Sequence, residues 1–386
     1  MKKVLYITTV SRTINSFLVP HIEMLLENGY KVDCATCIDK NVNQVLINKG
    51  VKIFNIPFSR SPLSFGNIKA FKELIKLQKE NQYDIIHVHT PIASIYGRLL
   101  KLKFKNLKTI YTAHGYHFFK GGAKIGWIIY YPIEKIMAKL TDVTININKE
   151  DYEITKKRLK PKKCYLVNGV GLDLNHYKPL SKEKQESKRK ELGLEKDDFV
   201  IIMIAELNEN KNQIQFIKAM ELLKDRYPNI RAISVGEGHK FEELQKEINN
   251  RGLKNNFKLL GFRTDINELI NISDIGILLS YREGLPRNIM ELMANGKKVI
   301  ATNVRGSRDL VYNESIGSLV EVGDFEETAR SIEKFYLTSV NNKNNILKEV
   351  KRYSISSILT ELIFVYDNLQ GGENKNGKMS SYITNE

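Results

Sequence analysis

The chain has 386 residues, of which 42% are hydrophobic and 27% charged, and its formal net charge is +16. This length exceeds what one hydrophobic core usually organises, so two domains are expected. No stretch reaches the roughly 20 apolar residues needed to span a bilayer. The apolar run at residues 4–7 is too short for a signal peptide, which predicts a cytoplasmic protein. The positive charge predicts attraction to an anionic partner: nucleic acid, a phosphorylated substrate or an anionic bilayer surface.

Short apolar runs alternate with amphipathic stretches along the first half, as is typical of parallel α/β architecture. Strands are predicted at Val4–Val10, Lys31–Thr36, Val51–Ile56, Ile85–His89, Thr109–Thr112, Val143–Ile147 and Cys164–Val167. Helices between them include Phe17–Glu27, Ile68–Lys79 and Tyr131–Leu140. The pair Cys34 and Cys37 falls at the end of a predicted strand, so we interpret it as structural rather than as a redox or zinc motif.

A polar, highly charged stretch at Lys178–Lys190 predicts a linker, after which the alternation restarts. Strands are predicted at Phe199–Ile204, Arg231–Val235, Phe257–Leu260, Ile275–Leu279, Lys298–Ala301 and Ser318–Val320. Helices are predicted at Gln213–Leu223, Phe241–Asn250, Asp265–Asn271, Arg287–Ala294, Phe325–Tyr336 and Ser354–Leu369.

We therefore predict two Rossmann-like, doubly wound domains that face each other across a cleft. The first comprises residues 1–177 and the second residues 178–350, and a C-terminal helix at 351–370 is expected to pack back on the first. The polar tail at 371–386 is expected to be disordered. Open α/β sheets bind ligands beyond the carboxyl ends of their strands, so functional residues should follow strands.

Two basic clusters carry much of the charge. The first is Arg98, Lys101, Lys103, Lys105 and Lys108, interleaved with apolar residues, and the second lies within residues 156–163. Both clusters fit an ordinary solvated face. The first cluster also fits a surface that contacts anionic lipid. The aromatic segment Ile125–Ile133, between two lysines, fits either a buried helix or an interfacial segment.

The most informative segment holds two carboxylates, Glu283 and Glu291, eight positions apart. A predicted strand leads into it, and Glu291 falls on the following helix. Gly284 allows close approach of a ligand to the backbone, and Pro286 suits the start of a helix. Helix N-termini attract phosphate and carboxylates accept hydrogen bonds from sugar hydroxyls, so this segment fits both halves of a nucleotide-sugar.

Other polar or glycine-containing segments also follow predicted strands. Lys211 is placed to act as a point charge on a diphosphate. Gly236 begins a Gly-Glu-Gly turn, and Phe262 with Arg263 occupies the equivalent place after the next strand, where these residues could edge a base. The sequence contains no G-x-G-x-x-G motif, so nothing in it indicates a dinucleotide cofactor.

Histidines follow two strands of the first half. His114, next to a glycine, can reach into a cleft to bind a sugar or stabilise a charge. His87 and His89 share one face of a strand, because side chains repeat every two residues. No third ligand is apparent near them and no Asp-x-Asp follows a strand, so no metal and no other cofactor is expected.

Together these residues resemble glycosyltransferase family 4, whose members are retaining enzymes with the GT-B fold, and in particular its bacterial capsule and exopolysaccharide enzymes. The resemblance extends from the first strand to residue 369. It is carried by the Glu283–Glu291 segment with its Glu-Gly-Leu-Pro core, and by residues 87–91, 112–115, 168–173 and 296–303.

The resemblance implies a role for each matching residue. Glu283 would contact the donor sugar, with His114 reaching it from the first domain, and Glu291 would contact the ribose. Lys211 would hold the diphosphate with backbone amides near Leu285 and Pro286, and Phe262 and Arg263 would frame a uracil. His89 and Ser16 would lie on the acceptor side. Retention is attributed in this family to attack on the same face, with the leaving diphosphate accepting the proton.

This chain departs from the family in two places. Glu206 stands where many members have an arginine, so Lys211 would need another cation, such as Arg282 or Arg287. The loop Thr8–Ser16 lacks the glycine pair of its relatives.

The expected function is transfer of a sugar, from a UDP-linked donor, to a lipid-linked saccharide in cell-surface glycan synthesis. The enzyme is expected to sit peripherally on the inner face of the bacterial cell membrane. A sugar-nucleotide epimerase or other GT-B enzyme is the alternative, because fold alone does not settle function. A nucleic-acid-binding protein is supported by charge alone, since no recognition motif is present.

Overall fold

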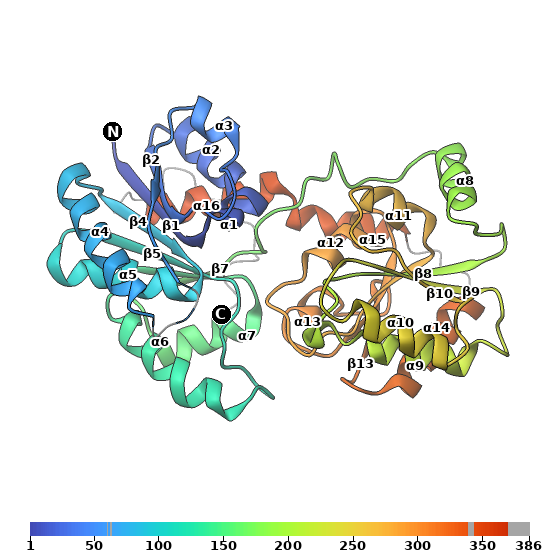
Figure 1. Ribbon diagram of the computed structural model, residues 1–386. Coiled ribbons are helices and arrows are strands. Elements are labelled where there is room, and N and C mark those ends of the chain that lie inside the picture. Colours follow the sequence, from blue (N-terminus) through green and yellow to red (C-terminus); the bar gives the residue numbers. More distant parts are fainter. Residues whose placement is uncertain (60, 62–63, 339–342, 370–386) are drawn as a thin grey trace. The chain divides into compact units, whose positions relative to one another are not determined.

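The chain forms two compact units in the computed structural model shown in Figure 1, which describes residues 1–59, 61, 64–338 and 343–369. The first unit comprises Met1–Gly171 together with the segment from Ile355 on, and the second comprises Leu172–Ser354. The boundaries predicted from the sequence, at 177/178 and 350/351, fall a few residues from these crossings. The tail predicted to be disordered, 371–386, lies outside the described residues.

The first unit is built on a parallel sheet of seven strands in the order β3-β2-β1-β4-β5-β6-β7. Its strands are β1 (Lys3–Val10), β2 (Lys31–Cys37), β3 (Ile53–Asn55), β4 (Ile85–His89), β5 (Lys108–Ala113), β6 (Val143–Asn146) and β7 (Lys163–Leu166). The strand order reverses between β1 and β4, and in such sheets this point is where ligands bind.

Helices cover both faces of this sheet (Figure 1). They are α1 (Ser11–Thr13), α2 (Val19–Glu27), α3 (Gln44–Asn48), α4 (Gly66–Asn81), α5 (Pro91–Lys103), α6 (Tyr131–Ala138), α7 (Lys149–Ile154) and α16 (Ile355–Leu369), with the π-helical turns η1 (Ile14–Leu18), η2 (Gly126–Tyr130) and η3 (Thr155–Leu159). Strand side chains alternate between the faces: Val4 and Tyr6 pack with α2 and α16, whereas Leu5 and Ile7 pack with α4 and α5.

The second unit has a parallel sheet of six strands in the order β10-β9-β8-β11-β12-β13. Its strands are β8 (Phe199–Ile204), β9 (Ile230–Val235), β10 (Phe257–Leu259), β11 (Ile275–Leu278), β12 (Lys298–Thr302) and β13 (Gly317–Val320). Its helices are α8 (Lys182–Glu191), α9 (Gln213–Leu223), α10 (Phe241–Asn250), α11 (Ile266–Ile272), α12 (Arg287–Ala294), α13 (Ser307–Leu310), α14 (Phe325–Leu337) and α15 (Lys343–Glu349), with the 3₁₀ turns η4 (Glu209–Lys211) and η5 (Val350–Tyr353). Here the order reverses between β8 and β11.

These two doubly wound sheets confirm the predicted α/β class, and each predicted strand has an observed counterpart. Among the described helices, none is both long and apolar enough to cross a membrane. The CxxC pair lies at the end of β2 as predicted, and Cys34 and Cys37 are both free thiols.

The predicted linker at Lys178–Lys190 is wrong, because most of it forms α8. This helix buries none of its own residues, so it lacks the apolar periodicity by which helices are found in sequences. Ionic contacts hold it instead. The ammonium of Lys188 pairs with Asp265 at 2.8 Å and with Glu268 at 2.9 Å.

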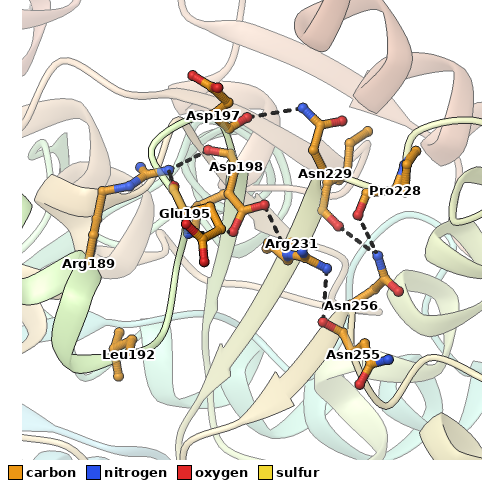
Figure 2. Close-up of polar contacts among 12 residues, drawn as sticks. Arg189, Leu192, Glu195, Asp197, Asp198, Pro228, Asn229, Arg231, Asn255 and Asn256 are labelled. Atoms are coloured by element: carbon orange, nitrogen blue, oxygen red, sulfur yellow. Dashed lines mark hydrogen bonds and ion pairs between the residues drawn. The ribbon is translucent and has the colours of Figure 1, made fainter.

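Figure 2 shows a second set of contacts that fastens α8 to the sheet, at the amino ends of β8–β10. The guanidinium of Arg189 donates to the backbone oxygens of Glu195 and Asp198. The Asp198 carboxylate in turn accepts from Nε of Arg231 at 3.0 Å. This network lies at the opposite edge of the sheet from the carboxyl ends and is structural.

Candidate functional site

The centre of the candidate site is an ion pair between Lys211 and Glu283, whose Nζ and Oε1 atoms lie 2.5 Å apart. Lys211 ends η4, just after β8, and Glu283 follows β11. Because β8 and β11 are neighbours at the reversal of strand order, parallel pairing brings together two loops that are far apart in sequence. The structure thus joins two residues that the sequence analysis selected separately.

The loop from Glu283 to α12 is tightly held. Nε of Arg305 donates to the backbone oxygen of Glu283 at 3.0 Å, and Arg305 is buried. A Cβ atom at Gly306 would lie 2.2 Å from the backbone oxygen of Gly284, so the loop after β12 packs directly on this segment. Pro286 has an extended conformation immediately before the first residue of α12. Gly284, Leu285 and Pro286 therefore form the approach to a helix N-terminus, which suits an anion.

Glu291 lies on α12 and is buried. Burial raises the pKa of its carboxyl group above the ordinary value, and nearby Arg287 opposes this effect. Nε of Arg287 lies 3.2 Å from Oε1 of Glu291, and the hydroxyl of Tyr177 lies beside this carboxylate. Burial and the Glu291 charge raise the pKa of Tyr177 well above its usual range. Glu291 is thus a fixed acceptor held by two partners, which suits recognition of hydroxyl groups more than proton transfer.

Gly236 follows β9 and adopts φ +144°, a conformation that favours glycine. A Cβ atom there would lie 2.0 Å from the backbone oxygen of Ala205, just after β8. The close packing of these two loops is sufficient reason for a glycine, whether or not a ligand also approaches it.

Phe262 and Arg263 follow β10, one strand beyond Gly236 in the sheet. Phe262 is 68% exposed. The guanidinium of Arg263 donates to both oxygens of Asp265, at 2.8 and 2.5 Å, and lies 3.3 Å from Glu191. Its charge is therefore largely engaged by carboxylates, whereas the exposed ring of Phe262 offers a face for a base.

In the first unit, His89 ends β4 and His114 follows the neighbouring β5. Nδ1 of His89 lies 3.0 Å from Nε2 of His114. Thr90, next to His89, has φ +66°, which is a strained conformation for a β-branched residue. Its hydroxyl lies 2.7 Å from that of Thr9 at the end of β1. Such outliers persist where the surroundings enforce them, and this one adjoins the candidate histidines.

Ser16 lies in η1 and is exposed, with its hydroxyl donating to the backbone oxygen of Arg12 at 2.7 Å. It lies on the segment that follows β1, the strand next to β4. Phe17, its neighbour, places its ring 5.2 Å from that of His114.

Two residues of the second-unit site, Arg305 and Tyr177, were not predicted from the sequence. Arg305 follows β12, and its position after a predicted strand was a usable signal. Arg282 and Arg287 were the cations expected to assist Lys211. Arg282 is exposed and Arg287 pairs with Glu291, whereas Arg305 donates to the backbone oxygen of Glu283. Tyr177 precedes the whole second sheet, and nothing in its local sequence marks it.

No group of three or more His, Cys, Asp or Glu side chains that could hold a metal ion occurs among the described residues.

Comparisons with known proteins agree with this architecture. Residues 184–352 match the family model described as "Glycosyl transferases group 1", and residues 3–148 match "Glycosyl transferase 4-like". The putative glycosyltransferase EpsD of Bacillus subtilis is 35% identical over 341 residues, which cover 87% of each chain. UDP-Gal:alpha-D-GlcNAc-diphosphoundecaprenol alpha-1,3-galactosyltransferase of Escherichia coli is 31% identical over 286 residues, covering 72% of this chain and 73% of that one. The crystal structure of Anabaena HepE with UDP and glucose has a TM-score of 0.79 at 20% identity, covering 95% of this chain and all of that one.

The two doubly wound parallel sheets and the likeness to HepE define the GT-B fold, and the two family models define the protein as a glycosyltransferase. The chain belongs to the group 1, family 4-like glycosyltransferases.

Proposed function

We propose that this enzyme transfers a sugar from a UDP-linked donor to a saccharide carried on a polyprenyl diphosphate, for a capsule or exopolysaccharide. The observation that carries the donor half is the Lys211–Glu283 pair beside the start of α12. An ammonium, a helix N-terminus and two carboxylates lie on one edge of a sheet, and these are the groups that a sugar diphosphate requires.

In this proposal the diphosphate binds Lys211 and the amides before α12. Glu283 accepts from the sugar hydroxyls and Glu291 from the ribose. Charge on the diphosphate is neutralised by protein cations, without a metal ion. Because Lys211 already engages Glu283, that carboxylate is not a free base. This supports attack assisted by the leaving diphosphate, with retention of configuration.

The proposal for the acceptor is supported by the names of two similar enzymes. The Escherichia coli enzyme named above, and a Campylobacter jejuni enzyme that is 24% identical, carry names that specify diphospho-undecaprenol acceptors. An enzyme that meets such an acceptor must work at a membrane surface, which we propose is the inner face of the cell membrane.

A surface of the first unit supports this location. The segment of η2, its preceding residue Ile125, and α6 exposes four isoleucines whose spacing places them along one side. They are Ile125 (57%), Ile128 (69%), Ile129 (46%) and Ile136 (59%). Exposed lysines flank them at 124, 135 and 139. Contiguous apolar side chains rimmed by cations fit the interface of an anionic bilayer. We call these four isoleucines the isoleucine face.

Of the two basic clusters, the second contacts the same segment of the chain. The guanidinium of Arg158, in η3, lies 5.3 Å from the ring centroid of Trp127 in η2. In the first cluster two charges are internal: Arg98 is buried against Glu134 at 2.8 Å, and Lys101 pairs with Asp142. The buried-helix alternative for Ile125–Ile133 does not hold, because only the opposite side of this segment packs on the core.

The donor proposal is tested by supplying UDP-, GDP- and dTDP-sugars with a membrane lipid extract and measuring nucleoside diphosphate release and labelled lipid. We expect release with UDP-sugars, and loss of about 100-fold or more in Lys211→Ala and Glu291→Ala while both variants keep the wild-type circular dichroism. Full activity in both variants would overturn the site. Conversion of the sugar without transfer would identify an epimerase instead.

The membrane proposal is tested by sedimentation with vesicles of phosphatidylglycerol and phosphatidylcholine. The double variant Ile128→Ser, Ile129→Ser should lower the fraction bound to anionic vesicles at least about tenfold, because two exposed side chains lose apolar insertion. Leu222→Ser, which removes an exposed apolar side chain of the second unit, is the matched control. Equal binding of both variants would refute the isoleucine face.

A further inference from the structure

Four aromatic rings form a column inside the first unit. The rings of His87 and His89 stack with centroids 4.4 Å apart, His89 and His114 with centroids 5.3 Å apart, and Tyr6 lies 5.3 Å from His89. His87 and His89 share one face of β4, so both rings project to the same side of the sheet as Tyr6. Three of the chain's seven histidines are thus in one stack.

The inner end of this column is anchored on both sides. Nδ1 of His87 lies 2.8 Å from the hydroxyl of Tyr366 on α16, and Nε2 lies 2.8 Å from the hydroxyl of Thr112 on β5. Both hydroxyls can donate or accept, so His87 has partners in either tautomer.

His89 is different, because only one of its nitrogens has a partner. Nδ1 lies 3.0 Å from Nε2 of His114, whereas Nε2 is buried with no hydrogen-bond partner among the described residues. His114 uses only its Nε2 in these contacts. Its Nδ1 makes no hydrogen bond to another described residue and is not buried.

Both rings are neutral near pH 7. Burial, helped by neighbouring His21, lowers the pKa of His114 to about 4, and burial lowers the pKa of His89 well below its ordinary value. A hydrogen bond between two neutral imidazoles allows two arrangements. In one, His89 donates from Nδ1 and its buried Nε2 is a bare lone pair. In the other, His114 donates from Nε2, and His89 must then bury an N–H group without an acceptor.

Orphaned buried N–H groups are rarer than orphaned acceptors, and a stranded donor costs about 1–3 kcal/mol. The first arrangement is therefore favoured. In this arrangement Nε2 of His114 accepts a hydrogen bond, so the single ring proton of neutral His114 must be on Nδ1.

We propose that His89 is a positioning residue, which donates to His114 and holds it as the Nδ1-protonated tautomer. His114 then presents a hydrogen-bond donor, not an acceptor, to an oxygen of the substrate. Such a donor fits a sugar hydroxyl oxygen or a diphosphate oxygen. The strained Thr90 and the ring contacts of Phe17 and Tyr6 hold the two histidines in this register.

The direct test is the tautomer itself, measured on ¹⁵N-histidine-labelled protein by long-range ¹H–¹⁵N correlation spectra, with His114→Gln used to assign the signals. We expect a protonated Nδ1 and an unprotonated Nε2 in His114 of the wild type. A protonated Nε2 there would overturn the proposal whether or not any variant folds.

Variants at position 89 add a second test. Phenylalanine keeps the stacking surface but removes the donor, so His89→Phe should release His114 to the other tautomer. Asparagine carries an amide nitrogen at the position of Nδ1, so His89→Asn should restore the Nδ1-protonated form. A His114 tautomer that is the same in all three proteins would also overturn the proposal.

The kinetic arm rests on the proposed sugar transfer. We expect kcat to fall about 10-fold or more in His89→Phe, to recover to within about threefold in His89→Asn, and the donor KM to change little in either. A purely structural role predicts equal loss in both. If the wild type proves inactive with every donor, the proposed function fails, and the spectra still decide the tautomer.

Discussion

At the scale of single residues, Glu283 and a bound diphosphate would compete for the ammonium of Lys211. The ammonium that we expect to bind a diphosphate already contacts a carboxylate at 2.5 Å. Phosphate must therefore draw Lys211 away from Glu283 or share it. The buried Arg305, which donates to the backbone of the same glutamate, is the cation best placed to assist. We propose that Arg305 supplies the second cation that many relatives have as an arginine at the position of Glu206.

This competition predicts that substitutions of the two residues affect UDP affinity differently, as measured by isothermal titration calorimetry. Lys211→Ala should weaken UDP binding about 10- to 100-fold, because a charge-assisted hydrogen bond contributes about 1.5–3 kcal/mol. Glu283→Gln should leave UDP binding unchanged or tighten it, because the lysine loses its competing carboxylate. Transfer should nevertheless fall in Glu283→Gln. Equal weakening of UDP binding in both variants would contradict the roles assigned here.

At the scale of elements, the site depends on loops that pack backbone against backbone. Gly306 adopts φ +75° and leaves no room for a side chain beside Gly284. Gly236 does the same beside Ala205. The first contact joins the loops after β12 and β11, and the second joins those after β9 and β8. The backbone N–H of Tyr281 donates to the backbone oxygen of Asn210 at 2.8 Å and so links the two pairs, which pre-positions Lys211 and Glu283 before a ligand arrives.

A matched pair of glycine substitutions separates packing from backbone strain. Gly261 has a similar φ of +67°, but a Cβ atom there would meet nothing within 4 Å. Gly261→Ala should therefore cost only about 1–2 kcal/mol of unfolding free energy, from the left-handed backbone. Gly306→Ala should cost more by at least about 1 kcal/mol and should also weaken UDP binding, because the 283–286 segment must move. Urea unfolding and calorimetry on both variants measure this, and equal stability would rule out the packing argument.

At the scale of the whole molecule, buried histidines make the stability of the first unit depend on pH. The first unit buries His21, His87 and His89, and keeps His114 largely enclosed. Burial lowers the pKa of His21 to about 4, while its Nε2 contacts the backbone oxygen of Val170 at 2.9 Å. Between about pH 6.5 and pH 4, the unfolded chain binds protons at these histidines and the folded chain does not. The free energy of unfolding therefore falls as the pH falls through this window.

We expect this loss of stability to appear in the fluorescence of Trp127, the one tryptophan of the chain, which lies in the first unit. His21 alone contributes roughly 3 kcal/mol across the window. His21→Gln keeps a donor near Val170 but does not titrate. The number of protons taken up on unfolding, which the slope of unfolding free energy against pH measures, should therefore fall by about one. His176→Gln, at an exposed histidine of the second unit, is the control. The prediction fails if both variants retain the wild-type slope.

The sequence determined the order of elements well, because short β-rich runs and intervening amphipathic helices carry their own periodicity. It also selected Lys211, Glu283, Glu291 and His114 from their positions after strands or on the helix that follows. It failed at α8, where charged side chains replace the apolar stripe that marks a helix. The sequence also did not decide whether Ile125–Ile133 is a buried helix or an interfacial segment, since periodicity does not tell which side of a short helix is covered.

What only the tertiary structure decided is which groups meet. Strand order brings Lys211 to Glu283, packing brings Arg305 and Tyr177 to the same edge, and alternation along β4 stacks His87 on His89 beneath His114. Local sequence specifies which residues follow a strand, because propensity and pattern act over a few residues. Partners far apart in the chain are set by sheet order and burial, which depend on the whole fold.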